Sequence, residues 1–92
     1  MISFEEFLKD NLVLLDGAMG SLIYEKGVFI DKCYDELNLS RPELIGSIHE
    51  EYVRSGARVL ETNTYGANRF KLKSHNLLDQ MEEINRKGVE LA

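Results

Sequence analysis

Two short runs that favour strands, the first of them entirely apolar, constrain the fold of this otherwise helical chain more than any other feature. Residues 12–15 are all apolar, and residues 57–61 come directly after a helical pattern that ends at Gly56. A short apolar run without alternation is typical of a strand buried on both faces of a parallel sheet. Because helical patterns lie before, between and after the two runs, we predict an α/β fold with a parallel sheet and about two βα units.

The first third of the chain predicts two helices. Ser3 and Glu6 have capping-box spacing at the start of a helix over residues 3–10. A second helix is expected over residues 18–26. Residues 28–39 show no clear period and predict an irregular excursion.

A longer helix is predicted between Ser40 and Gly56. Ser40 and Glu43 form a second possible capping box, Pro42 suits the first turn, and Gly56 suits the C-terminal end. The apolar side chains expected on its buried face are Leu44, Ile45, Ile48 and Tyr52.

The last helix is predicted over residues 77–91, with Asn76 and Asp79 at its N-terminal end, where they can cap it and complement its dipole. Just before it, Arg69, Lys71 and Lys73 alternate along a helix or turn, and a solvated face explains them better than a phosphate site.

Composition excludes several classes of partner. The 92 residues carry a net charge of −5 without a Lys/Arg cluster, which argues against nucleic acid and anionic membranes. The same charge disfavours an RNA-clamping interpretation of the G-x-x-G pattern at residues 17–20. A single cysteine, Cys33, excludes an internal disulfide, and the N-terminus lacks a signal-peptide pattern. We therefore predict a cytoplasmic protein.

Two loops could hold a ligand, because parallel α/β folds bind ligands at the C-terminal ends of their strands. In the first loop, Asp16 could accept from an ammonium group, and the small residues after it expose backbone N–H groups that could hold a carboxylate. A plain Asp-Gly turn would explain the same residues. In the second loop, Thr62, Asn63 and Thr64 could orient a polar ligand or cap the following turn.

Three strings, in this order and at this spacing, carry a resemblance to a known family. They are LLDGAMGS, CYDELNLSRPELIGSIHEEY and SGARVLETNTYGANRFKL, and together they span roughly residues 10–91. The chain resembles the opening of the homocysteine S-methyltransferase family. Its TNTYGAN string is most similar to the bacterial members that are joined to a methylenetetrahydrofolate reductase.

This resemblance implies that residues 1–92 are the N-terminal fragment of a (β/α)₈ TIM-type barrel. The family uses zinc to bind homocysteine as a thiolate, which takes a methyl group and becomes methionine. The methyl donor stays open among folate, betaine, S-methylmethionine and cobalamin forms. By resemblance, the substrate-binding residues are Asp16 for the ammonium, the N–H groups of Gly17, Ala18 and Met19 for the carboxylate, and Thr62, Asn63 and Thr64 along the pocket.

The family's zinc ligands are cysteines in Asn-Cys and Gly-Gly-Cys-Cys segments, and this sequence has neither. We assign no metal ligand and no catalytic residue to the chain, and we read Cys33 as a buried residue. His49 and His75 lack partners at metal-ligand spacing, so a packed or surface role is favoured. We expect the chain alone to be inactive, with the rest of the barrel or a second copy covering its open sheet edge. The alternative is a non-catalytic small-molecule-binding or self-assembling α/β fragment.

Overall fold

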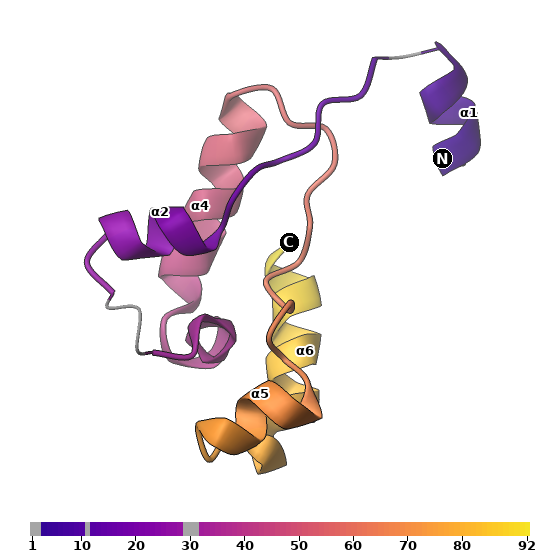
Figure 1. Cartoon of the computed structure of the whole chain (residues 1–92). Helices are drawn as coiled ribbons and strands as arrows, with labels where there is room; N and C mark the ends of the chain where they lie inside the picture. Colours follow the sequence, from indigo (N-terminus) through magenta and orange to yellow (C-terminus); the bar gives the residue numbers. More distant parts are fainter. Residues whose placement is uncertain (1–2, 11, 29–31) are drawn as a thin grey trace.

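The computed structural model describes residues 3–10, 12–28 and 32–92, and helices dominate them (Figure 1). The elements in chain order are α1 (Phe4–Asp10), α2 (Gly20–Glu25), η1 (Tyr34–Glu36), α3 (Leu37–Ser40), α4 (Pro42–Arg54), α5 (Arg69–Ser74), η2 (Leu78–Gln80) and α6 (Met81–Leu91). None of the helices in these ranges is both long and apolar enough to cross a membrane.

The predicted α/β fold with two βα units is wrong for this chain. The described residues form no strand and no sheet, so the N-terminal part of a TIM-type barrel is not what the structure shows. Residues 12–15 and 57–61, the two predicted strands, do lie side by side as extended segments (Figure 1). They share one isolated parallel bridge, between Leu15 and Val59, with hydrogen bonds of 2.8 Å from Arg58 N–H to the Leu14 carbonyl and 3.1 Å from Asp16 N–H to the Val59 carbonyl.

Missing neighbours explain why the pairing stops at one bridge. Two parallel segments do not make an independent sheet, because each needs a further strand or a covering helix on its other side. The predicted burial on both faces also fails: Leu12, Leu14 and Leu15 are 101%, 57% and 52% exposed. An apolar run does not by itself bury its side chains when the surrounding elements are absent.

The first two predicted helices are confirmed. Helix α1 begins after Ser3, whose hydroxyl accepts a hydrogen bond of 3.2 Å from Glu6 N–H, as the capping pattern predicted. Helix α2 is shorter than expected, and it ends before Gly27, which has a φ of 100°. A side chain is strained at that φ, so glycine suits the turn.

The excursion over residues 28–39 is more regular than predicted. Residues 29–31 lie outside the described part, but η1 and α3 follow them. Ser40 therefore ends α3, with its hydroxyl donating to the Glu36 carbonyl at 3.5 Å, and the capping box predicted with Glu43 does not form. Pro42 does begin α4, since its missing N–H is not needed there.

The C-terminal region matches its prediction in outline. Residues 69–74 form α5, capped by Asn68, whose side chain accepts from Lys71 N–H at 3.0 Å. The last helix begins as the short turn η2 and continues as α6. Asn76 adopts a left-handed φ of 59° before the turn, outside the capping position expected for it.

Two apolar clusters hold these helices together. One joins α2, α3 and α4 through Ile23, Leu37, Leu44, Ile45 and Ile48. The other joins α5 and α6 to the preceding loop through Cys33, Ala67, Leu72 and Ile84. The predicted face of α4 is confirmed at Leu44, Ile45 and Ile48, while Tyr52 is only half-buried. One extended segment leads from α1 to α2 and the other from α4 to α5, and they carry the two candidate loops (Figure 1).

Candidate functional site

One cleft of about 700 Å³ brings the two predicted loops together. Its wall includes all seven predicted substrate-binding residues: Asp16, Gly17, Ala18, Met19, Thr62, Asn63 and Thr64. The two loops are far apart in sequence, and the isolated bridge between the extended segments aligns their ends. A cleft of this size with a few polar groups is suited to a small molecule.

Asp16 joins the two loops. Its Oδ2 accepts a hydrogen bond of 2.9 Å from the N–H of Glu61, which is 45 residues away in the chain. Its Oδ1 is buried and has no hydrogen-bond partner among the described residues. A buried carboxylate oxygen without a donor is costly, so this atom creates a demand for a positively polarised group.

The backbone after Asp16 lies against helix α4. The Tyr52 hydroxyl donates a hydrogen bond of 2.6 Å to the carbonyl of Ala18. A Cβ added at Gly17 would lie 3.1 Å from that hydroxyl oxygen, so glycine permits the close approach. Met19 packs partly buried against the first apolar cluster and precedes helix α2. Tyr52 therefore fixes one wall of the cleft, a role that the sequence did not indicate.

The second loop presents hydroxyls on the cleft side and an amide on the inner side. The hydroxyls of Thr62 and Thr64 lie 2.6 Å apart and share one hydrogen bond. Asn63 is only 7% exposed, and its amide nitrogen donates to the Tyr34 carbonyl at 2.9 Å and to Asn38 Oδ1 at 3.0 Å. The side chain of Asn63 thus anchors the loop to η1 and α3, while the two hydroxyls remain beside the cleft.

Asn38 completes this anchor and is itself fully buried. Its amide nitrogen donates to the carbonyls of Asn63, at 2.8 Å, and Ile84, at 3.1 Å. One side chain therefore ties the second loop to both α3 and α6. Sequence reasoning missed it because only its place within the string DELNL marked it.

Asp35 and Lys71 also line the cleft, and neither was predicted as a site residue. Asp35 is buried in η1, and its Oδ1 accepts a hydrogen bond of 3.2 Å from Gly66 N–H. Burial raises the pKa of the Asp35 carboxyl from its ordinary value of 3.8, against the opposing effects of that hydrogen bond and of the Lys71 charge. Asp35 therefore sits where its charged form is disfavoured.

Replacing Asp35 with asparagine is expected to remove a pH dependence of stability. A carboxyl whose pKa is raised on folding stabilises the protein fully below pH 3.8 and loses that contribution as pH rises through the folded pKa. The free energy of unfolding of the wild type, minus that of Asp35→Asn, should therefore fall as pH rises from 3.8. Urea titrations at several pH values measure this difference. A difference that grows with pH would contradict the expectation.

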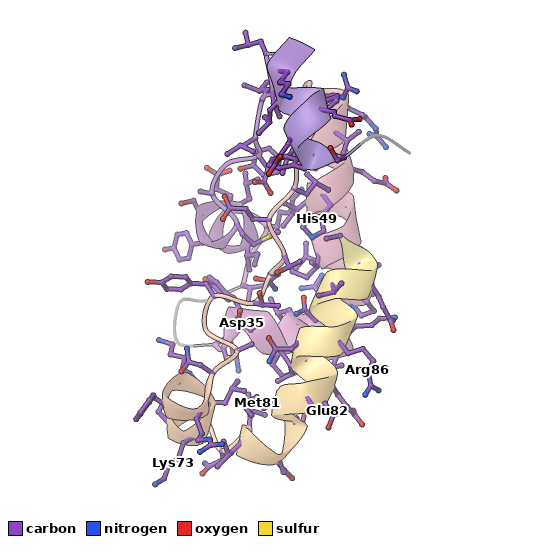
Figure 2. All side chains as sticks on the ribbon, turned by 90° about the vertical axis from the view of Figure 1, so that its right-hand side faces the viewer. Asp35, His49, Lys73, Met81, Glu82 and Arg86 are labelled. Atoms are coloured by element: carbon purple, nitrogen blue, oxygen red, sulfur yellow. The ribbon has the colours of Figure 1, made fainter. Side chains whose placement is uncertain are left out.

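His49 lies on α4 and is 3% exposed, which is the packed one of the two roles, packed or surface, expected for it (Figure 2). Burial lowers the pKa of the imidazole, and the nearby charge of Asp16 acts in the opposite direction. The imidazole is thus held in its neutral form near Asp16.

The described residues do not fit a zinc ion. They contain no group of three or more His, Cys, Asp or Glu side chains that could hold a metal. Cys33 is buried among Ala67, Leu72 and Ile84, as predicted for a packed cysteine. The cleft wall carries oxygen acceptors together with Lys71.

Comparison with known proteins shows the family of this chain. The family model described as homocysteine S-methyltransferase matches residues 13–92, and the chain belongs to that family. It is 30% identical to methionine synthase of Mycobacterium tuberculosis (strain ATCC 25618 / H37Rv) and, equally, to methionine synthase of Mycobacterium leprae (strain TN). Each alignment covers 95% of this chain, which spans only 8% of the length of either relative.

Proposed function

We propose that this chain forms the amino-acid-binding part of a homocysteine S-methyltransferase. Asp16 takes the ammonium group of homocysteine, and the backbone N–H groups of Gly17, Ala18 and Met19 take its carboxylate. The observation that carries the proposal is the cleft in which Asp16 meets the second loop, with one carboxylate oxygen held by Glu61 N–H. A held carboxylate is preorganised for a cation, because its orientation is set before the ligand arrives.

The second loop lines the same pocket in this proposal. Thr62 and Thr64 offer hydroxyls that can donate or accept, since either can be the donor of their shared hydrogen bond. Asn63 contributes by holding the loop in place through its two buried amide hydrogen bonds.

Zinc and the methyl donor belong to the complete domain in our proposal. Zinc would be held by ligands outside these residues and would bind the homocysteine thiolate, so that transfer of a methyl group gives methionine. The chain alone then binds homocysteine without turning it over. Methionine formation by the purified chain with zinc and a methyl donor would refute this division of roles. A cytoplasmic location stays a prediction from the sequence.

Replacing Asp16 with asparagine is expected to weaken homocysteine binding about 10- to 100-fold, the loss typical of one charged hydrogen bond. The amide oxygen can still accept from Glu61 N–H, so the loop should keep its shape while losing the charge. Calorimetric titration of the full chain with homocysteine measures the change. The control variant is Asp79→Asn, on an exposed position of η2.

A second ligand separates the ammonium contact from a general loss of binding. The analogue of homocysteine without its amino group should bind the wild type and Asp16→Asn with similar affinity, because it has no cation for Asp16 to hold. If Asp16→Asn weakened both ligands equally, or neither, the assignment of Asp16 would be wrong. Absence of any homocysteine binding to the wild type would favour the non-catalytic or self-assembling alternative.

A further inference from the structure

The imidazole of His49 is a buried polar group that the proposed function does not use. It is 3% exposed, and neither of its ring nitrogens has a hydrogen-bond partner among the residues that the structure describes. Native proteins pair nearly all such groups, so a buried imidazole with two unmatched nitrogens calls for an explanation. The described residues place no metal-binding group around it, which leaves hydrogen bonding as its chemistry.

Asp16 has an unpaired hydrogen-bond acceptor that could match it. Its Oδ1 is also buried and unpaired within the described ranges, while Oδ2 is held by Glu61 N–H. Helix α4 lies against the backbone that follows Asp16: the Tyr52 hydroxyl donates to the Ala18 carbonyl at 2.6 Å, and His49 lies three residues before Tyr52 on the same side of that helix. A neutral imidazole always has one N–H donor, and a carboxylate oxygen is an acceptor only. One unmatched donor and one unmatched acceptor thus lie in the same buried region, on α4 and on the first loop.

We propose that His49 is a positioning residue for Asp16: its imidazole donates a hydrogen bond to Asp16 Oδ1 through one bound water, because the two groups make no direct hydrogen bond. Helix α4 then fixes one carboxylate oxygen and the second loop fixes the other. The carboxylate of Asp16, a residue of the cleft wall, is then held from two elements. A neutral histidine suits this role, since it orients the carboxylate without neutralising the charge that a cationic ligand needs.

The hydrogen bond itself does not depend on any ligand and can be tested without one. Nitrogen-15 spectra of the histidine rings in the full chain report which nitrogen carries the proton and whether it is hydrogen-bonded. Asp16→Asn should shift the ring resonances of His49 and leave those of His75 unchanged, because His75 lies on the turn after α5. Asp79→Asn should shift neither. Unchanged His49 resonances in Asp16→Asn would overturn the proposal.

The effect on the ligand rests on the proposed function and needs a matched pair of variants. His49→Gln keeps a donor, whereas His49→Leu keeps a similar volume without one. We expect homocysteine binding to weaken about 10-fold in His49→Leu and by less than about 3-fold in His49→Gln, in line with loss of one hydrogen bond. Equal weakening in both would mean that His49 acts through packing alone and would overturn the positioning role.

The two tests fail in different ways. If the wild type binds no homocysteine, the proposed function fails, and the ring spectra still decide whether His49 holds Asp16. If the wild type binds homocysteine and the His49 resonances are unchanged in Asp16→Asn, the proposed function is supported and the positioning role is wrong. Thermal unfolding of His49→Leu and His49→Gln shows whether each variant still folds. Should both fail to fold, the spectra of the wild type and Asp16→Asn remain decisive.

Discussion

Replacing Asn38 with alanine is expected to lower the free energy of unfolding by about 3 kcal/mol, one of the two largest effects that we anticipate. Asn38 is fully buried and makes three hydrogen bonds, two as donor to the carbonyls of Asn63 and Ile84 and one as acceptor from the Asn63 amide. Alanine removes all three and takes the donor away from the Asn63 carbonyl, while the Asn63 amide keeps its hydrogen bond to the Tyr34 carbonyl. Such a buried acceptor costs more than the lost bond itself, because water cannot reach it.

Urea denaturation followed by circular dichroism measures this loss. Asn85→Ala is the matched control, since Asn85 is half-buried and its amide donates to the carbonyls of Ala67 and Met81. It should lose only about 1 kcal/mol, because water can replace its partners and alanine favours the helix. Equal losses of free energy of unfolding in the two variants would show that the buried hydrogen bonds of Asn38 stabilise the fold no more than the half-buried ones of Asn85.

Gly88→Ala is expected to destabilise the protein by about 2 kcal/mol, although alanine normally favours a helix over glycine. Gly88 lies in α6 where the helix contacts the second loop. A Cβ there would come within 2.7 Å of Thr64 Cγ2 and 2.9 Å of Asn38 Nδ2. Thr64 is β-branched and Asn38 is held by buried hydrogen bonds, so neither side chain can move aside cheaply.

Gly46→Ala provides an internal control for this prediction. Gly46 lies in α4, and an added Cβ meets nothing within 4 Å among the described residues. That variant should gain about 1 kcal/mol from helix propensity alone. Urea denaturation of both variants gives the comparison, and homocysteine titration shows whether displacement of Thr64 also weakens binding. A stabilised Gly88→Ala would mean that α6 does not press against the second loop.

The helices show how far local signals reach. The Ser3 cap and Pro42 at the start of α4 both act within about one turn of chain, so the sequence predicts them correctly. The failed cap at Ser40 has the opposite cause. Helix α3 continues through that residue, packing Leu37 and Asn38 into the interior, and a tertiary contact overrode a local preference.

The extended segments show where local signals stop. An apolar run over residues 12–15 predicts a buried strand, but pairing and burial need partners from elsewhere in a chain. The described residues supply a single bridge, at Leu15 and Val59, and so the α/β prediction is wrong. The same bridge nevertheless brings Asp16 to the second loop, as expected for the ends of parallel segments.

The residues of the candidate site also fall into two groups, those that the sequence marks and those that only the structure reveals. The amino-acid sequence by itself marked Asp16 and residues 62–64, because their residue types and their order resemble a known family. Only the tertiary structure revealed Asn38 and Asp35 as supports of the second loop. The physical reason is that burial and hydrogen bonding between residues far apart in the chain decide these roles, and neither leaves a local pattern in the sequence.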